Sequence, residues 1–411
     1  MSNTEELIDR AVYTDKIKGF FDKEPVKIIT GIRRCGKSKI MKLLARDALE
    51  QVGSEYVIYM DFETAEFDNI TSYRELNKYI NRRMKKDGRY FVFLDEVQDI
   101  EGWERSVNAL RHKNADIYVT GSNSKLLSGE MATRLAGRYV AFETGTLSFP
   151  EFIDFRKRSG LADSGKDRYE MLDKYIATGG FPLLSVAEFT DEQARQAVRD
   201  IHSSAVLRDV VERYKVKNVP LLNRIIAFIY DSVGSFLSIK RITDHLKNAG
   251  NKVDHETVSS YVGYLENALI IRRAERCDVK GGKLLSGNSK FYLADHSLQY
   301  AVRGMRLTNR PGILENIVYN DLIRRGYTVY VGKAGEKEVD LVATEVNGGR
   351  VYVQVCTEIR NDDTAEREFS PLESIKDHHP KYVVTADRYW GENRNGITSI
   401  HLADFLLKEE L

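Results

Sequence analysis

The chain has 411 residues, of which 42% are hydrophobic and 30% charged, a composition typical of globular proteins. Its length predicts two to four domains. It contains no run of about 18 apolar residues, so we expect no membrane-spanning helix, and the polar start at Met1–Glu6 lacks the features of a secretory signal. The cysteines Cys35, Cys277 and Cys356 are too far apart for a metal-binding or paired spacing, which favours the reducing cytoplasm.

The formal net charge is only +1, so no overall field attracts nucleic acid. The charge is nevertheless uneven along the chain. From Arg208 to Lys290, 15 Lys and Arg stand against 9 Asp and Glu, whereas from Pro311 to Leu411 the numbers are 12 and 18. The basic middle region is therefore where we expect contact with nucleic acid, and with DNA in particular.

Short apolar, β-branched runs alternate with helical segments over the first 150 residues. The predicted strands are Val26–Thr30, Tyr56–Asp61, Tyr90–Leu94, Asp116–Thr120 and Tyr139–Glu143. A helix is predicted over Lys39–Leu49, and further helical segments separate most of the other strands. This alternation predicts an α/β domain with a parallel sheet over residues 1–150.

A phosphate-binding loop of the pattern G-x-x-x-x-G-K-[ST] joins the first strand to the first helix. It comprises Gly31, Ile32, Arg33, Arg34, Cys35, Gly36, Lys37 and Ser38, and Lys39 follows in the helix. Gly31 and Gly36 allow tight turns that point backbone N–H groups at phosphate oxygens, and the helix N-terminus adds its dipole. Lys37 can reach the β- and γ-phosphates of ATP, while the Ser38 hydroxyl can bind Mg²⁺. A chance match in an ordinary turn is the alternative, and the flanking strand and helix argue against it.

The strand Tyr90–Leu94 is followed by two adjacent acids. We expect Asp95, at the strand tip, to hold the Mg²⁺ shell and Glu96 to polarise the attacking water as a general base. The alternative is that the two acids cap the following helix. Together with the phosphate loop, they predict hydrolysis of ATP as well as binding.

Polar residues follow the next strand. Asn123 is the first candidate for a hydrogen bond to the γ-phosphate or the water, and Ser122 is the second; a turn-forming pair is the alternative. Arg134 and Arg138 then precede the strand Tyr139–Glu143. An arginine from a neighbouring subunit can stabilise charge on a transferring phosphoryl group, and we favour Arg138 for this role over a solvated ion pair. A trans-acting arginine predicts a homo-oligomer, such as a ring.

These motifs resemble those of AAA+-like P-loop ATPases of bacteria and archaea that carry a C-terminal domain of unknown function. Besides the phosphate loop, the resemblance rests on Leu94–Gln98, Thr120–Ser124, Leu135–Tyr139, Leu147–Phe152, Leu314–Asn316, Glu338–Asp340 and Asp377–Thr385. It spans nearly the whole chain. It implies an ATPase module, a winged-helix region and a C-terminal α/β domain with a restriction-endonuclease-like fold.

After the first domain we expect a helical lid region over residues 151–218 and a winged-helix-like domain over 219–310. Ser238 and Asp254 are predicted to cap two short helices joined by a glycine turn, the arrangement of a helix-turn-helix. The outer face of the second helix carries no Arg or Lys, so it is poorly suited to reading bases.

A basic wing follows the second of these helices. The residues that could contact phosphates there are Arg272, Arg273, Arg276, Lys280 and Lys283. The alternative is that the domain is a lid of the ATPase and that these charges are solvated. We favour contact with DNA.

Residues 311–411 carry part of a nuclease pattern. Glu315, Asp340 and the Gln354-Val355-Cys356 run resemble an acid, acid, Glu/Gln-x-Lys arrangement, in which the acids bind Mg²⁺ and the lysine stabilises charge. Cys356 stands where the lysine belongs, and Arg360 is several residues away. We therefore expect a nuclease-like fold without nuclease activity, used for packing or protein contacts. A reactive thiol at Cys356 is less favoured, because strand cysteines are usually buried.

The combined motifs predict a cytoplasmic, Mg²⁺-dependent ATPase that couples hydrolysis to conformational change or remodelling on nucleic acid. The alternative is an ATP-dependent switch that controls a protein–protein interaction. A third hypothesis is an ATP-gated nuclease, and Cys356 argues against it.

Overall fold

The computed structural model describes residues 7–123, 137–161, 165–303, 309–388 and 392–411. The chain divides into two compact units, Met1–Thr144 and Gly145–Leu411. The end of the first domain, expected after residue 150, thus falls a few residues earlier. Within the described ranges, every helix is too short or too polar to cross a bilayer.

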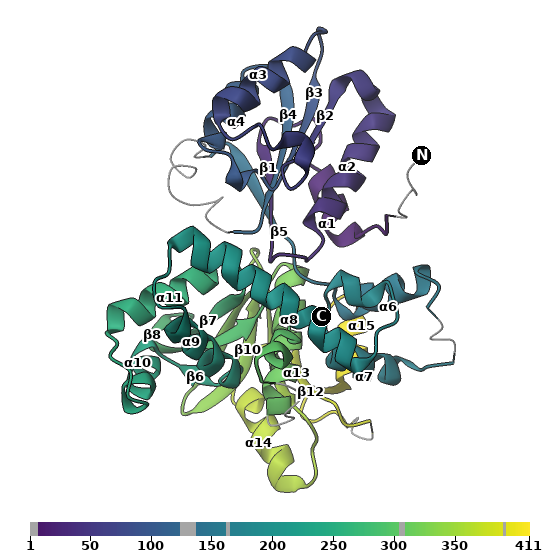
Figure 1. Ribbon diagram of the computed structural model, residues 1–411. Helices are drawn as coiled ribbons and strands as arrows, with labels where there is room; N and C mark the ends of the chain where they lie inside the picture. Colours follow the sequence, from purple (N-terminus) through teal and green to yellow (C-terminus); the bar gives the residue numbers. More distant parts are fainter. Residues whose placement is uncertain (1–6, 124–136, 162–164, 304–308, 389–391) are drawn as a thin grey trace. The chain divides into compact units, whose positions relative to one another are not determined.

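The first unit is a five-stranded parallel sheet with helices on both faces (Figure 1). Its strands are β1 Val26–Thr30, β2 Val57–Asp61, β3 Tyr90–Asp95, β4 Ala115–Gly121 and β5 Tyr139–Glu143, in the order β2-β3-β4-β1-β5. Every neighbouring pair is parallel. The five predicted strands and the predicted parallel α/β fold are therefore confirmed, with strand ends shifted by at most one residue.

The helices of the first unit cover the sheet because each presents an apolar stripe to it. They are α1 Ala11–Lys18, α2 Lys37–Val52, α3 Tyr73–Arg83 and α4 Trp103–Arg111, with short 3₁₀ turns at Ser54–Tyr56, Ala65–Phe67 and Val97–Asp99. In α2, Ile40, Leu44 and Ala48 are spaced four residues apart and are fully buried in one core. Leu76 and Ile80 of α3 are buried in the core on the opposite face. Strands covered on both faces are buried along their whole length, as β3 is, and β3 is apolar up to Asp95 at its end.

The second unit is built on one mixed sheet of eight strands in the order β13-β12-β11-β10-β9-β7-β8-β6. The strands are β6 Phe236–Leu237, β7 Ile271–Asp278, β8 Leu284–Leu293, β9 Thr328–Ala334, β10 Lys337–Thr344, β11 Arg350–Cys356, β12 Lys381–Thr385 and β13 Thr398–His401. The pairs β7–β9, β11–β12 and β12–β13 are parallel, and the other neighbours are antiparallel.

The pairing of β7 with β9 joins two regions that the sequence analysis separates. Arg276 lies opposite Val331, and Asp278 lies opposite Lys333. The expected winged-helix-like region, 219–310, and the expected C-terminal domain, 311–411, thus share one sheet, and the expected lid region, 151–218, lies in the same compact unit. Local sequence patterns do not reveal this, because the pairing joins strands that are distant in the chain.

The second unit has helices both before and after β9 in the chain. They are α6 Phe149–Arg158, α7 Arg168–Thr178, α8 Asp191–Val206, α9 Val219–Asp231, α10 Ile239–Asn248, α11 His255–Asn267, α12 Leu298–Arg303, α13 Arg310–Arg325, α14 Asp362–Glu373 and α15 Leu402–Leu407. A π-helical turn, Leu207–Glu212, continues α8, and a 3₁₀ turn spans Pro182–Ser185.

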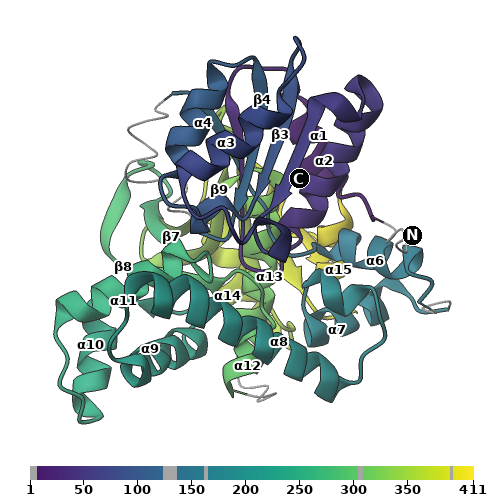
Figure 2. The same ribbon diagram turned by 45° about the horizontal axis from the view of Figure 1, so that its top comes forward.

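The two predicted helices of the helix-turn-helix are present as α10 and α11. Ser238 accepts a hydrogen bond from the backbone N–H of Arg241 at 3.2 Å, and Asp254 accepts one from Thr257 at 2.6 Å. Both predicted N-caps are therefore confirmed. Figures 1 and 2 show α9, α10 and α11 packed together at the end of the sheet that carries β8.

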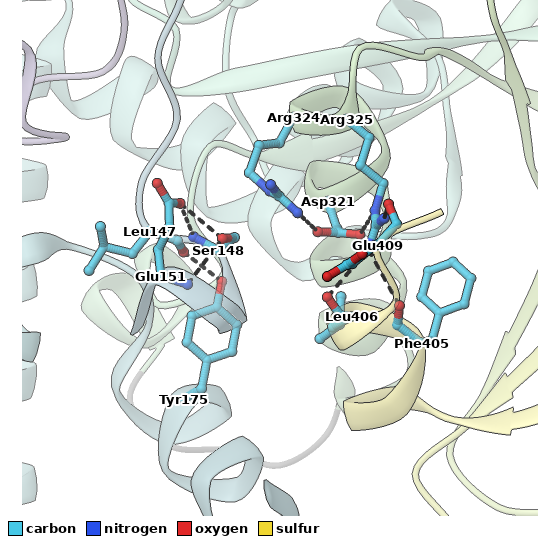
Figure 3. A network of polar contacts seen from close by, with 10 residues as sticks. All are labelled: Leu147, Ser148, Glu151, Tyr175, Asp321, Arg324, Arg325, Phe405, Leu406 and Glu409. Carbon is cyan, nitrogen blue, oxygen red and sulfur yellow. Dashed lines mark hydrogen bonds and ion pairs between the residues drawn. The ribbon is translucent and has the colours of Figure 1, made fainter. Parts of the chain in front are cut away.

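A polar network ties α13 to the C-terminal helix α15 (Figure 3). Asp321 pairs with Arg324 and Arg325, each at 2.6 Å. The Arg325 guanidinium also donates to three backbone carbonyls, those of Phe405, Leu406 and Glu409. These bonds satisfy carbonyls at the end of α15 that have no partner within the helix, and they hold in place the helix that carries Glu315.

Candidate functional site

The parallel sheet of the first unit brings three predicted site segments to one edge. The phosphate loop follows β1, Asp95 and Glu96 lie at the end of β3, and Ser122 and Asn123 follow β4. Because β1 and β3 both pair with β4 in parallel, the carboxyl ends of the three strands lie side by side. This edge is where open α/β sheets bind their ligands.

The phosphate loop has the backbone geometry of an anion-binding turn. Arg34 and Gly36 have left-handed φ angles of 66° and 106°, a conformation in which successive N–H groups can face one anion. A Cβ at Gly31 would lie 2.3 Å from the carbonyl oxygen of Thr144, so only glycine fits there. Helix α2 begins at Lys37, directly after the loop, and its N-terminus faces the loop with its positive dipole end.

Lys37 and Glu96 form a buried ion pair beside the phosphate loop. The Nζ of Lys37 lies 3.1 Å from Oε1 of Glu96 and donates to the carbonyl of Gly31 at 3.2 Å. The side-chain amide of Gln98 donates to the other Glu96 oxygen at 2.6 Å. Although burial opposes ionisation, Lys37 and Gln98 hold the pKa of Glu96 below its usual value. Glu96 is therefore a carboxylate and can accept a proton.

Thr120, on β4, connects the two acids. Its hydroxyl donates to Oδ1 of Asp95 and accepts the backbone N–H of Glu96 at 2.8 Å. Tyr59, on β2, donates to the other Asp95 oxygen at 2.8 Å. Burial raises the pKa of Asp95 above its usual value, and the hydrogen bonds from these two donors offset only part of that rise. The sequence analysis missed Thr120 and Tyr59 as site residues, because only the register of the strands places them beside Asp95.

Arg10 is a further residue that no motif marked. It is buried, and its guanidinium donates to the carbonyl of Cys35 in the phosphate loop at 2.9 Å. The same guanidinium lies 4.6 Å from the ring centroid of Tyr13 in α1. Arg10 therefore ties the segment before α1 to the phosphate loop.

The other predicted loop residues divide into buried and accessible groups. Ile32 and Cys35 are buried, whereas Ser38 and Lys39 are partly exposed at the start of α2. Arg33 pairs with Glu63 at 2.9 Å. The side chains of Ile32 and Cys35 thus lie in the core, whereas those of Ser38 and Lys39 remain partly accessible.

The remaining predicted residues of the first unit lie in three different settings. Ser122 and Asn123 are fully buried at the end of β4. Arg134 lies outside the described residues. Arg138 is exposed, and its carbonyl accepts the N–H of Val26 at the start of β1. Since β1 and β5 run parallel over five residues, Arg138 lies roughly 16 Å of strand away from the phosphate loop of its own chain.

The basic wing residues are not equivalent in the structure. Arg272, Arg273 and Arg276 have partners inside the second unit, which are Asn320, Glu266 and the ring of Phe236, respectively. Lys280 and Lys283 are exposed in the loop between β7 and β8. The lysines are therefore better placed than the arginines for contact with a phosphate backbone.

A hollow of about 500 Å³ lies beside the start of α11. Tyr214 and Tyr264 stack there with ring centroids 3.9 Å apart, and Lys215 and Lys217 line the same hollow. The lysines bring positive charge to a helix whose own outer face has none. The sequence analysis missed them because they precede α9 and are distant from α11 in the chain.

Neither Cys356 nor Arg360 can take the place of the lysine that the nuclease pattern lacks. Burial raises the pKa of the Cys356 thiol to about 12, so it is neutral and poorly nucleophilic. Arg360 is exposed and paired with Glu358. Gln354 accepts the backbone N–H of Asp340 at 3.2 Å. The absence of a lysine at position 356 is therefore not compensated by these neighbours.

Comparison with known proteins identifies the family. Residues 23–153 match the family described as AAA domain, and residues 169–309 match a domain of unknown function (DUF8612). An uncharacterized protein of Haemophilus influenzae is 36% identical over 410 residues, which cover 98% of this chain and 99% of that protein. The chain belongs to the family of that protein. The uncharacterized protein MJ1544 of Methanocaldococcus jannaschii is 30% identical over 363 residues, 86% of this chain and 79% of that protein.

The AAA match supports the AAA+-like P-loop ATPase module that the resemblance implies. The family's second matched region carries no named fold, and the restriction-endonuclease-like fold is not confirmed. In this chain the two matched regions lie between residues 23 and 309.

Solved structures of low similarity were also found. Cdc6p of Pyrobaculum aerophilum has a TM-score of 0.35 at 11% identity and covers 77% of this chain and 97% of its own. Aeropyrum pernix ORC1 in complex with DNA has a TM-score of 0.31 at 15% identity, and the match covers 72% of this chain and 91% of that chain. AMPPCP-bound DnaA of Aquifex aeolicus has a TM-score of 0.31 at 18% identity, and the match covers 62% of this chain and 85% of that chain. Scores this low carry no argument about function.

Replacing Thr120 by valine tests whether this hydroxyl positions the two acids. We expect nucleotide binding to persist and ATP turnover to fall by roughly 10- to 100-fold, the equivalent of about 1.5–3 kcal/mol for a lost hydrogen bond to a charged group. Steady-state phosphate release and nucleotide titration measure the two effects. Ser106→Ala, which removes another buried hydroxyl of the same unit, is the control, and wild-type turnover in Thr120→Val would contradict the assignment.

Proposed function

We propose that the first unit hydrolyses ATP and that the protein uses this reaction to change conformation while bound to nucleic acid. The observation that carries the proposal is the Lys37–Glu96 pair, held at 3.1 Å beside the phosphate loop at the carboxyl edge of a parallel sheet. The AAA match to residues 23–153 agrees with it. We assign the activity to the cytoplasm, a proposal that the three free, buried cysteines support.

Each group at this edge has a role that follows from its chemistry. The backbone of the phosphate loop and the Lys37 ammonium bind the phosphates, and the Glu96 carboxylate orients and deprotonates the attacking water. The residues present fit Mg²⁺, because the Ser38 hydroxyl and the Asp95 carboxylate are oxygen ligands of the kind it prefers. When bound, this ion would neutralise charge on the phosphates. Asn123 is proposed to hydrogen-bond the γ-phosphate or the water.

Lys37 must leave Glu96, at least in part, to bind phosphate. The ion pair therefore couples phosphate binding to release of the proton acceptor. This coupling favours one alternative function, a slow ATP-dependent switch that controls a protein–protein interaction. A turnover rate that no nucleic acid stimulates would support the switch over an activity on DNA.

A homo-oligomer, such as a ring, is the proposed working form. Arg138 is exposed at the edge of the sheet opposite its own phosphate loop, so the role of a charge-stabilising arginine is open to it only at a neighbouring subunit. Arg134 is a second proposed arginine of this kind.

DNA is the proposed nucleic acid partner. The exposed Lys280 and Lys283 in the loop between β7 and β8 are the proposed phosphate contacts. The stacked tyrosines Tyr214 and Tyr264, with Lys215 and Lys217, form a second candidate contact beside α11.

Substitution of Lys37 and of Glu96 separates binding from hydrolysis. Lys37→Ala should lose nucleotide binding or turnover, because it removes the positive charge at the phosphates. Glu96→Gln should retain binding and lower turnover by about 100-fold or more, because the proton acceptor is gone. Glu104→Gln, a buried glutamate of the same unit, is the matched control. Normal turnover in Glu96→Gln would refute the general-base role.

Mixing subunits tests Arg138. Arg138→Ala should be inactive or strongly impaired alone, because no subunit supplies the arginine to its neighbour. Mixed with a Glu96→Gln chain, which keeps Arg138, it should regain activity in a concentration-dependent manner. Arg82→Ala, another exposed arginine, is the control. An impaired mutant that mixing never rescues would refute the trans-acting role of Arg138.

Charge reversal tests the DNA contact. Lys280→Glu/Lys283→Glu should weaken binding about equally for all DNA sequences and reduce the slope of log affinity against log salt by about 1 for each lysine. Fluorescence anisotropy at several salt concentrations measures both. The control Lys376→Glu/Lys408→Glu makes the same charge change at two exposed lysines. Equal DNA binding by the two double variants would show that Lys280 and Lys283 are not the contact.

A further inference from the structure

Lys290 of β8 is buried among three carboxylates of the second unit. Its side chain is only 3% exposed, and Nζ lies 2.8 Å from Glu338, 2.9 Å from Glu315 and 3.2 Å from Asp340. Helix α13 supplies Glu315, and strand β10 supplies the other two acids. A single ammonium therefore joins three elements that are far apart in the sequence.

Hydrogen bonds fix the carboxylates around the ammonium. The Tyr292 hydroxyl donates to the same Glu315 oxygen that Lys290 contacts. The second oxygen of Asp340 accepts the N–H of Val355 at 3.0 Å. The carboxylates are thus oriented by the fold and do not depend on a bound ligand for their arrangement.

The nuclease resemblance implies a divalent cation held by Glu315 and Asp340, and these residues do not fit one. Mg²⁺ needs oxygen ligands at about 2.0–2.1 Å in octahedral geometry, whereas the carboxylate oxygens converge on the Nζ of Lys290 at 2.8–3.2 Å. In the described part of the chain, no group of three or more His, Cys, Asp or Glu side chains is arranged to hold a metal ion.

We propose that the Lys290 ammonium is a built-in substitute for a divalent cation, and that removing it turns the carboxylate cluster into a divalent-cation site. In the wild-type protein the lysine then holds β8, α13 and β10 together as a scaffold, and the cluster takes no metal. This proposal is independent of ATP hydrolysis, which involves the first unit.

The charge balance of the cluster supports the proposal. Three carboxylates surround one ammonium, so negative charge is in excess. All three acids lie within 3.2 Å of the Lys290 ammonium. Once the ammonium is removed, nothing in the cluster balances the three carboxylates, and a dication would offset more of their charge than the ammonium did.

The test uses the full-length chain without nucleotide and Mn²⁺ as the probe, with electron paramagnetic resonance for binding and thermal melting for stability. Wild-type protein should bind no Mn²⁺ at this cluster and melt at the same temperature with or without it. Lys290→Met should melt at a lower temperature, bind one Mn²⁺ about tenfold or more tightly than the wild type, and recover stability when Mn²⁺ is added. Lys337→Met, an exposed lysine of β10, should resemble the wild type.

Two results would overturn the proposal. One is Mn²⁺ binding by the wild type that Asp340→Asn abolishes, because the cluster would then hold a metal beside Lys290. The other is a folded Lys290→Met that takes up no Mn²⁺. If Lys290→Met does not fold, the double variant Lys290→Met/Glu315→Gln is used for the same measurement, because it carries less uncompensated charge. The test of Mn²⁺ binding by the wild type does not depend on either variant.

Discussion

The parallel pairing of β1 and β3 with β4 is the constraint on which the candidate active site depends. Parallel strands point their carboxyl ends the same way, so the segments that follow them meet at one edge of the sheet. The phosphate loop, the two acids after β3 and the polar residues after β4 meet there for this reason. Thr120 then sets the relative position of Asp95 and Glu96 through two hydrogen bonds of one hydroxyl. The same parallel direction carries Arg138 to the opposite edge, which leads to the proposal of a shared site between subunits.

The second unit is organised by a different interaction, a buried ion cluster. Lys290 of β8 connects helix α13 to strand β10. Strands β8 and β10 belong to one mixed sheet, which also joins strands of residues 219–310 to the C-terminal strands. Three carboxylates around a metal are a common arrangement in enzymes that cleave phosphodiesters, and here an ammonium lies at their centre. In our proposal these acids hold the unit together and bind no metal. Lys280 and Lys283 are exposed in the loop before β8 and are the proposed contacts with DNA.

Much of the first unit could be predicted because its signals are local. The strands are continuous apolar runs, and the glycines and lysine of the phosphate loop have a fixed spacing. Both patterns can therefore be recognised within a few residues of sequence. The helix caps Ser238 and Asp254 were predictable for the same reason, since a cap bonds to a backbone N–H three residues later. Thr120, Tyr59, Arg10 and Lys290 could not be found this way. Each acts on a partner that strand pairing or helix packing brings close, and no spacing in the chain marks that partner.

The sequence by itself determined the parallel α/β unit, the phosphate loop and the acids Asp95 and Glu96, because hydrophobic periodicity and short-range backbone chemistry dictate them. The tertiary structure alone decided which groups contact those residues and how the rest of the chain divides. Cys356 stands where the nuclease pattern has its lysine, and the fold brings Lys290 of β8 to the acids Glu315 and Asp340 of that pattern. The physical reason is that ion pairs and hydrogen bonds form between groups that are close in space. The pairing of β7 with β9 and of Lys290 with Glu315 joins residues that are far apart in the sequence, so no local pattern predicts it.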